Sequence, residues 1–303
     1  MLRSSRLLRL PLFQVPFLLV PLLLGGCTKS KSAVISDPPQ LLEVMTFNVR
    51  YGAAKDGPDR WTLREGHVLG VIEGEAPAIL AVQEALDFQV DAILGRTEHF
   101  VKVGQHREGG TKNEFSGMFV NGRLLEVEAS GDLWLSETPS VIGSVGWDAA
   151  LTRNATWARF KSKANGKRFV VISTHFDHRG KEARLESARL LGAELGRRCQ
   201  EGAGEGQPPL PGLLFGDLNA GENSAPLDAL RAAGLVDTFR VAHPDAVEVG
   251  TFNAFRDERG GAKIDYILAT PEWETTAAEV LRPRHGGRCA SDHDPVKAAL
   301  LLR

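Results

Sequence analysis

Nine short apolar runs, each five to eight residues long, constrain the fold of this sequence more than any other feature. They are rich in β-branched, aromatic and leucine residues and are bounded by glycine, proline and polar residues, which predicts β-strands. Several are apolar at successive positions, as expected of strands in a sheet that is covered on both faces. The predicted strands are residues 42–49, 78–83, 116–121, 132–136, 155–160, 168–174, 212–217, 263–270 and 295–302.

Three of the intervening segments have helical periodicity. The predicted helices are residues 61–73, 87–94 and 181–197. The last of them carries an apolar stripe at helical spacing that includes Ala188 and Leu191. The glycine- and proline-rich composition of residues 200–211 predicts a loop. Because the sequence contains no repeat and no second linker, residues 41–303 are expected to form a single mixed α/β domain.

The first 26 residues have the pattern of an export signal. Three arginines and no acid are followed by an apolar run from Leu10 to Leu24, which three prolines interrupt. This run is a poor permanent membrane span, because a span needs about 20 apolar residues. The ending Leu24-Gly25-Gly26-Cys27 resembles a bacterial lipobox, in which Cys27 carries lipid, and a plain cleaved signal is the alternative.

We therefore expect a lipoprotein signal at residues 1–26 and a polar tether at residues 27–40. The predicted product is an exported bacterial protein that is anchored to a membrane through Cys27. Two further cysteines, Cys199 and Cys289, either form one bridge or remain thiols, since one pair is no disulfide framework. We expect a monomer.

The net charge argues against a polyanion as the main partner. The whole chain has a formal charge of −2, and without residues 1–26 it holds 33 Lys and Arg against 38 Asp and Glu, a net charge of −5. A nucleic-acid substrate is therefore not favoured, although it is not excluded. The local basic cluster consists of Arg282, Arg284, His285 and Arg288.

Polar side chains suited to metal and phosphate chemistry lie at or near the ends of several apolar runs. Ligands of α/β sheets bind outside strand ends. Carboxylate and amide oxygens suit Mg²⁺, Mn²⁺ or Ca²⁺, and two imidazoles suit acid–base work on a phosphate ester. The candidate residues are Asn48, Glu84, His175, Asp217, Asn219, Asp265, Asp292 and His293.

The sequences of these segments, and their order along the chain, resemble the motifs of the endonuclease/exonuclease/phosphatase superfamily, which has the DNase I-like fold. The motifs, in the family's order, are FNVRYG, QE, THFDHRG, GDLN, IDYI and SDHDP, within residues 42–302. The resemblance implies an α/β fold in which two mixed β-sheets, flanked by helices, form a four-layer α/β/β/α sandwich. The stretches at residues 131–160 and 184–191 further resemble a bacterial secreted subgroup.

The resemblance also implies a divalent metal site. It makes Glu84 the principal ligand, with Asn48 beside it and Asp292 assisting. Mg²⁺ is the expected ion, with Mn²⁺ or Ca²⁺ also suited. Two of these residues have a simpler structural alternative: Asn48 could serve a turn, and Glu84 could pair with Arg50.

The same resemblance implies the catalytic set. Asp217 orients or deprotonates the attacking water, and Asn219 holds the scissile phosphate. His293 contacts the phosphate while Asp265 fixes its tautomer, and His175 is a second acid or phosphate contact. Asp217 and Asn219 could instead form an Asx turn or cap a helix.

Four further residues are weaker candidates for contact with the substrate phosphate. Arg153 could reach a phosphate or pair with an acid. Glu114 lies where the subgroup often has a glutamate near the cleft, and a solvated charge at a strand edge is the alternative. Asp177 follows His175 in the THFDHRG motif. Asn253 stands where the subgroup commonly has a histidine, which weakens any contact made there.

The predicted function is hydrolysis of a phosphodiester or phosphomonoester by in-line attack of an activated water, with a metal ion. Alternatives are a nuclease acting on DNA or RNA, or a sphingomyelinase-like phospholipid hydrolase. A non-catalytic surface binding protein is the remaining alternative. Such a protein would be expected to lack one of Glu84, Asp217, Asp265 or His293, and all four are present.

Overall fold

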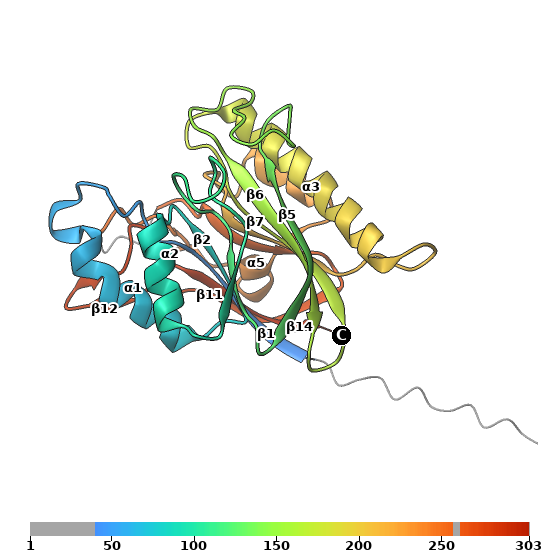
Figure 1. Cartoon of the computed structure of the whole chain (residues 1–303), viewed down its shortest axis with the longest axis horizontal. Helices are drawn as coiled ribbons and strands as arrows, with labels where there is room; N and C mark the ends of the chain where they lie inside the picture. Colours follow the sequence, from blue (N-terminus) through green and yellow to red (C-terminus); the bar gives the residue numbers. More distant parts are fainter. Residues whose placement is uncertain (1–39, 257–260, 303) are drawn as a thin grey trace, which may run out of the picture. The chain divides into compact units, whose positions relative to one another are not determined.

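The computed structural model describes residues 40–256 and 261–302. The expected signal, Cys27 and nearly all of the expected tether therefore lie outside the described residues. Two six-stranded mixed sheets pack against each other, and helices cover the outer face of each (Figure 1). The four-layer α/β/β/α sandwich expected from the motifs is thus confirmed.

The first sheet has the strand order β11-β14-β1-β2-β4-β3. Its strands are β11 (Trp273–Val280), β14 (Val296–Leu302), β1 (Gln40–Asn48), β2 (Ile79–Gln83), β4 (Met118–Asn121) and β3 (Phe100–Val103). Strands β1 and β2 are parallel, and the other neighbours are antiparallel. Helices α1 (Trp61–Glu75) and α2 (Asp87–Arg96) pack on its outer face.

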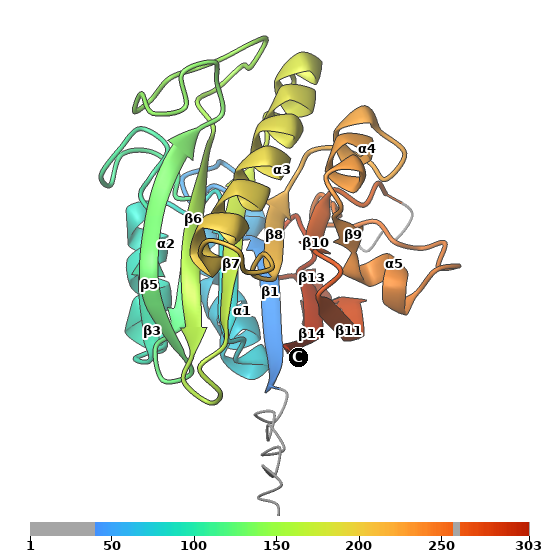
Figure 2. The ribbon, with the colours of Figure 1, turned by 90° about the vertical axis from the view of Figure 1, so that its right-hand side faces the viewer.

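The second sheet has the strand order β5-β6-β7-β8-β10-β9 (Figure 2). Its strands are β5 (Leu125–Trp134), β6 (Asn154–Ser162), β7 (Arg168–His175), β8 (Gly212–Asp217), β10 (Asp265–Ala269) and β9 (Val236–Asp237). Strands β7 and β8 are parallel, with antiparallel pairs elsewhere. Helices α3 (Lys181–Ala203) and α4 (Ala225–Ala232) cover its outer face.

The alternation of side chains along the central strands builds three cores. In β1, Val44 faces the second sheet, whereas Met45 and Phe47 face α1 and α2. In β8, Phe215 faces the first sheet and Leu214 faces α3 and α4. Because both faces are buried, these strands are apolar at successive positions, as the sequence predicted.

Several elements differ from the sequence-based expectation. Helix α3 continues through Ala203, so the predicted loop begins only at residue 204. The predicted strand 132–136 overlaps the end of the longer β5, in which residues 126–131 alternate between exposed and half-buried. Strands β3 and β11 and helices α4 and α5 (Thr238–Ala242) were not predicted, because they are short or carry many polar residues.

Smaller elements connect the layers. They are the 3-10 helix η1 (Gly57–Asp59) and the hairpin of β12 (Arg284–His285) and β13 (Arg288–Cys289). Cys199 and Cys289 are buried thiols, so the bridge left open by the sequence is not formed. Within residues 40–256 and 261–302, no helix combines the length and the apolar character needed to cross a membrane.

Candidate active site

Strand register places three of the predicted residues in one row at the edge of the second sheet. His175 is paired with Asp217 across β7 and β8, and Asp217 is paired with Asp265 across β8 and β10. Alternate residues of a strand face the same side of a sheet. Each of the three lies an even number of residues from one that faces the first sheet, such as Phe215 in β8 or Ile267 in β10. Their side chains therefore emerge where the core between the sheets ends.

Asn48 joins the two sheets at this edge. It is the last residue of β1, and its Nδ2 atom donates to Oδ2 of Asp217 at 3.1 Å and to Oε1 of Glu84 at 3.1 Å. The other Asp217 oxygen, Oδ1, accepts the backbone N–H of Asn219 at 2.9 Å. The Asx turn considered as an alternative is therefore present, and Oδ2 still faces the site. Burial and the neighbouring Asp265 carboxylate raise the pKa of Asp217 to about 7.

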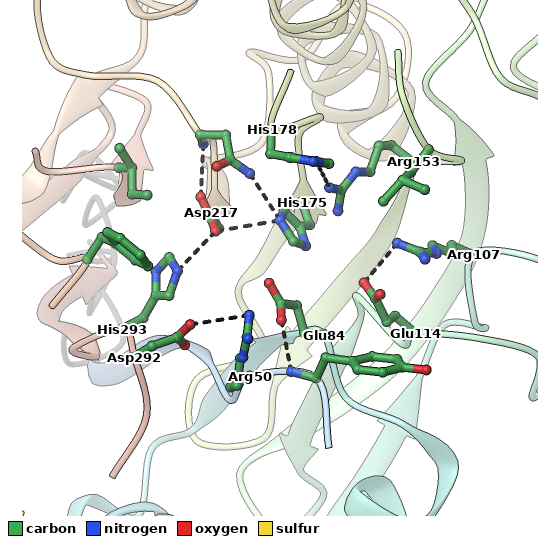
Figure 3. Close-up of a pocket in the computed structure, with 15 residues that line it drawn as sticks. Arg50, Glu84, Arg107, Glu114, Arg153, His175, His178, Asp217, Asp292 and His293 are labelled. Atoms are coloured by element: carbon green, nitrogen blue, oxygen red, sulfur yellow. Dashed lines mark hydrogen bonds and ion pairs between the residues drawn. The ribbon is translucent and has the colours of Figure 1, made fainter. Parts of the chain in front are cut away.

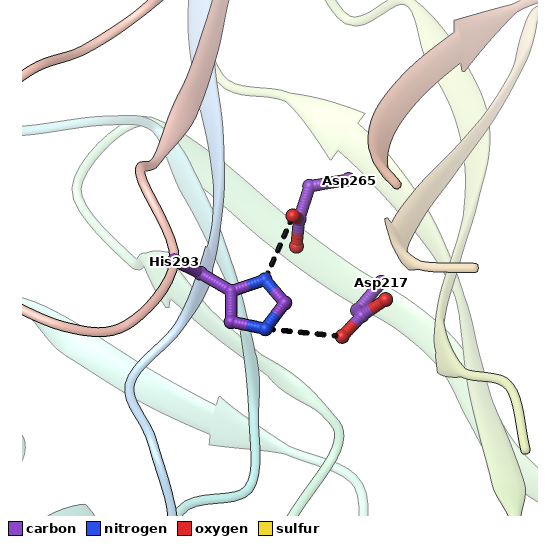
Figure 4. A group of neighbouring side chains, drawn as sticks. All are labelled: Asp217, Asp265 and His293. Atoms are coloured by element: carbon purple, nitrogen blue, oxygen red, sulfur yellow. Dashed lines mark hydrogen bonds and ion pairs between the residues drawn. The ribbon is translucent and has the colours of Figure 1, made fainter. Parts of the chain in front are cut away.

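His293 lies between two carboxylates. Its Nδ1 atom is 2.9 Å from Oδ2 of Asp265, and its Nε2 atom is 3.7 Å from Oδ2 of Asp217 (Figure 4). Burial alone would lower the pKa of His293, but these carboxylates hold that pKa well above its ordinary value. The neighbouring acids therefore favour the cationic form of the buried ring.

This contact joins segments that belong to different sheets. The predicted strands at residues 263–270 and 295–302 follow one another in the sequence, but β11 lies between β10 and β14 along the chain. Asp265 begins β10 of the second sheet, and His293 precedes β14 of the first. The contact thus depends on sheet packing and not on neighbouring strands.

His175 and Asn219 form a second polar pair. Nε2 of His175 lies 3.1 Å from Nδ2 of Asn219 and 3.5 Å from Oδ2 of Asp217. Burial and the nearby Arg153 guanidinium hold the pKa of His175 well below its ordinary value. A neutral His175 can accept a hydrogen bond from Asn219 through Nε2. Asn219 has a φ of +46° and also donates to the carbonyl of Phe176 at 3.0 Å.

Glu84 is held at the end of β2 in an uncommon backbone conformation. Its φ is +64°, and its Oε2 atom accepts the backbone N–H of Tyr51 at 2.8 Å. The alternative ion pair with Arg50 is not formed within the described structure. Arg50 instead contacts Asp56 at 2.9 Å and Oδ2 of Asp292 at 3.5 Å.

The carboxylate oxygens of Glu84 and Asp292 suit a hard divalent cation. Asn48 lies beside them but presents its Nδ2 atom to Glu84, while its Oδ1 atom accepts the backbone N–H of Arg50 at 3.0 Å. Burial raises the pKa of Asp292, and the nearby negative charge of Glu84 adds to this effect. Two carboxylates that disfavour each other's charge are suited to share a cation. Asp217, Asp265 and His293 also bring three ligand atoms within 4.8 Å of one another, but the ring of His293 is already engaged by Asp265.

These groups line one pocket of about 420 Å³ (Figure 3). The reacting end carries Glu84, Asp217, Asp292 and His293 together with His175 and Asn219. Asn48 and Asp265 lie behind this wall and support it. The remaining lining residues are Arg50, Tyr51, Arg107, Glu114, Leu151, Arg153, His178, Phe252 and Ile264.

The structure does not bring Asp177 to the pocket wall, in contrast to the expectation. Its Oδ1 atom accepts the backbone N–H groups of Arg179 at 2.9 Å and Gly180 at 2.7 Å, and Oδ2 accepts that of Leu151 at 3.2 Å. Burial opposes its charge, but these donors lower the pKa of Asp177 to about 2. Asp177 therefore organises loops and is not placed to contact a phosphate.

Asn253 likewise lies off the pocket wall. Its Oδ1 atom accepts the backbone N–H of Phe255 at 2.8 Å, and its own N–H donates to the carbonyl of Asp292 at 2.8 Å. The expected phosphate contact is thus replaced by support of the segment that carries Asp292. Arg153 and Glu114, by contrast, do line the pocket.

Sequence reasoning missed Arg107. Its Nη1 atom lies 2.9 Å from Oε2 of Glu114, and its carbonyl accepts from Nε1 of Trp134 at 2.6 Å. Arg107 lies in a glycine-containing loop with no periodicity and no motif, so nothing in the sequence singled it out. Tyr51 was missed as a separate contact, although it lies within the FNVRYG motif.

Two packed mixed sheets flanked by helices, with acids, amides and imidazoles gathered at one edge, define a protein of the DNase I-like class. A sequence comparison matches residues 45–293 to the endonuclease/exonuclease/phosphatase family. No curated protein matches the sequence.

Solved structures agree with this match. A Bacteroides vulgatus protein described as an endonuclease/exonuclease/phosphatase is 31% identical, with a TM-score of 0.78 over 87% of this chain and 100% of that one. A Bacteroides thetaiotaomicron member of the same family is 30% identical, with a TM-score of 0.79 over 88% of this chain and 99% of that one. The mannosyl-6-phosphatase of Bacteroides thetaiotaomicron is 32% identical, with a TM-score of 0.77 over 86% of this chain and 99% of that one. This chain belongs to the endonuclease/exonuclease/phosphatase family.

Proposed function

We propose that this protein is a metal-dependent phosphatase that hydrolyses small phosphate monoesters with an activated water. The observation that carries the proposal is the continuous chain of contacts Asp265–His293–Asp217–Asn48–Glu84. It brings a cationic imidazole, a carboxylate with a raised pKa and a metal-binding carboxylate to one pocket. In-line attack on phosphorus is assisted by each of these groups, through charge stabilisation, activation of water and metal binding.

Each residue has a role that follows from its protonation state. With its pKa near 7, Asp217 can accept the proton of the attacking water at neutral pH. The His293 cation can donate to a phosphoryl oxygen whose charge grows in the transition state. Asn219 and His175 lie beside Asp217, and an Asn219 N–H that is released from His175 can donate to another phosphate oxygen. Glu84 and Asp292 would hold a divalent cation such as Mg²⁺, with Asn48 beside them, and the ion would supply further charge neutralisation when bound.

The size of the pocket supports a small ester. A volume of about 420 Å³ is in the range of small-molecule sites. The net charge of −5 outside residues 1–26 also disfavours a long polyanion. Similarity to the mannosyl-6-phosphatase, at 32% identity, supports a monoester.

The experiment is a substrate panel with purified protein. Chromogenic phosphomonoesters and phosphodiesters are tested with Mg²⁺, Mn²⁺ and Ca²⁺ in turn, beside DNA, RNA and sphingomyelin liposomes. We expect turnover of monoesters and loss of at least about 10²-fold in kcat/KM for Asp217→Asn. Faster hydrolysis of nucleic acid or liposomes than of every monoester would overturn the proposal.

We also propose that the protein is exported and anchored through Cys27. This proposal rests on the sequence of residues 1–40 alone.

A further inference from the structure

We propose that the end of the pocket formed by Arg107, Glu114 and Arg153 recognises hydroxyl groups, so that the preferred leaving group is a sugar or another polyol. This inference rests on the proposed phosphatase function and deepens it. Figure 3 shows Glu114, Arg107 and Arg153 together on the side of the pocket away from His293.

The Arg107–Glu114 pair is built into the pocket wall. The two side chains are 2.9 Å apart, and the residues are only 6% and 8% exposed. Their loop is fixed by the Arg107 N–H, which donates to the Glu114 carbonyl at 2.9 Å. His106 adds a contact from Nδ1 to the Asn113 carbonyl at 2.7 Å. A buried ion pair adds little net stability, so two rigidly held charges on a pocket wall indicate a binding role.

This end of the pocket offers a free acceptor and a free donor. Oε2 of Glu114 accepts a hydrogen bond from Arg107. Within residues 40–256 and 261–302, no donor contacts the other carboxylate oxygen, Oε1. Arg153 uses Nη2 toward His178 at 3.3 Å and Nε toward Asp177 at 3.7 Å. Its Nη1 atom has no hydrogen-bond acceptor within the same described ranges. A hydroxyl group both donates and accepts, so it complements this arrangement.

The charge balance argues against a second anion at this end. Each guanidinium already has a carboxylate partner, Arg107 with Glu114 and Arg153 with Asp177. Burial and the Arg153 charge lower the pKa of His178, so the imidazole adds no cation at neutral pH. A second phosphate would face the Glu114 carboxylate, and like charges repel. An alkyl group would leave the free donor and acceptor desolvated and unpaired.

Two esters with the same kind of scissile bond test the inference. An aldohexose 6-phosphate and n-hexyl phosphate are both monoesters of primary alcohols, but only the first carries leaving-group hydroxyls. We expect the wild-type kcat/KM to be at least about 10²-fold higher for the hexose ester, because a site built to bind hydroxyls rejects an analogue that lacks them. Glu114→Gln is expected to lower this selectivity ratio by about 10-fold or more.

A conservative variant and a control variant distinguish loss of the hydroxyl contacts from misfolding. Arg153→Lys keeps the charge but loses the planar guanidinium and its N–H donors. It is expected to lower the ratio of kcat/KM for the hexose ester to that for the hexyl ester. Glu126→Gln changes an exposed glutamate of β5 and is expected to keep the wild-type ratio. Thermal melting of all three variants shows whether each is folded.

The outcomes separate the two proposals. If neither ester nor any chromogenic phosphomonoester is hydrolysed while phosphodiesters, nucleic acid or liposomes are, the proposed monoesterase function fails. If both esters are hydrolysed equally well, or both substitutions leave the ratio unchanged, the hydroxyl site is wrong and the phosphatase stands. A preference for a hexose bisphosphate over the hexose monophosphate would assign this end to a second anion and overturn the inference.

Discussion

The Nδ1 atom of His293 lies 2.9 Å from Oδ2 of Asp265, and this hydrogen bond joins residues carried by different sheets. The contact between Asn48 and Asp217, at 3.1 Å, crosses between the sheets in the same way. The reacting groups are therefore assembled by the packing of the two sheets. Substitutions in the core between the sheets are expected to alter the site as well as stability.

The His293–Asp265 pair is expected to act as one unit. Asp265→Asn keeps the size of the side chain but removes the charge that stabilises the imidazole cation, so kcat should fall by about 10²-fold. His293→Ala should cost at least as much, and the double variant should cost little more than His293→Ala. Steady-state kinetics of the four proteins measure the coupling. Additive losses would show that the two residues act independently, and Asp245→Asn, at an exposed site, is the control.

Activity is expected to require a divalent cation at Glu84. Glu84→Gln keeps the hydrogen-bonding shape and removes the negative charge, so the Mg²⁺ concentration for half-maximal activity should rise by at least about 10-fold. Calorimetric titration of Mn²⁺ into the folded protein gives a readout that does not depend on turnover. Glu98→Gln, at an exposed position, should titrate like the wild type. Undiminished wild-type activity in excess EDTA would contradict the prediction.

Gly216 is expected to be irreplaceable beside Asp217. Its φ is +145°, and a Cβ at this position would collide with the Thr174 carbonyl of the adjacent strand. Gly216→Ala should therefore lower the free energy of unfolding by at least about 2 kcal/mol. Gly221→Ala is the matched control, because no atom lies within 4 Å of the Cβ it would add. Equal urea midpoints for the two variants would contradict this account.

Asp177 is expected to make stability depend on acid pH. Its pKa of about 2 lies below the ordinary value of 3.8, so the ionised side chain stabilises the fold above about pH 4. That contribution, about 2 kcal/mol, is lost as pH falls from 4 through 2. Asp177→Asn should thus be less stable than the wild type at pH 7, with the difference shrinking toward pH 2. Urea unfolding at a series of pH values measures this, and a constant difference would argue against it.

The proposed lipid anchor predicts where the protein is found. Cys27→Ser removes the thiol that would carry lipid, so the variant should appear in the soluble fraction or remain unprocessed. Fractionation of cells, followed by detergent partitioning, detects the change. Wild-type processing and partitioning of the variant would show that Cys27 is not the anchor.

Strand patterns were enough to predict much of the site. Asn48, His175 and Asp217 end apolar runs, and their parity along those runs places them on the same face as the core between the sheets. The partnership of Asp265 with His293 was predicted, but its route was not, because periodicity carries no information about which sheet a strand joins.

Loop residues were harder to predict. The Arg107–Glu114 pair depends on the course of an irregular loop, which leaves no trace in residue spacing. The direction of the Asp177 side chain is decided by nearby backbone N–H groups, so its place in a motif suggested the wrong contact.

Strand β1 runs from Gln40 to Asn48, so the chain enters this domain at one end of the strand and reaches the pocket at the other. Nine extended residues separate these ends by roughly 30 Å. A chain attached upstream thus meets the domain on the side remote from the chemistry. A lipid anchor or a fusion partner joined ahead of Gln40 is therefore expected to leave the pocket accessible to substrate.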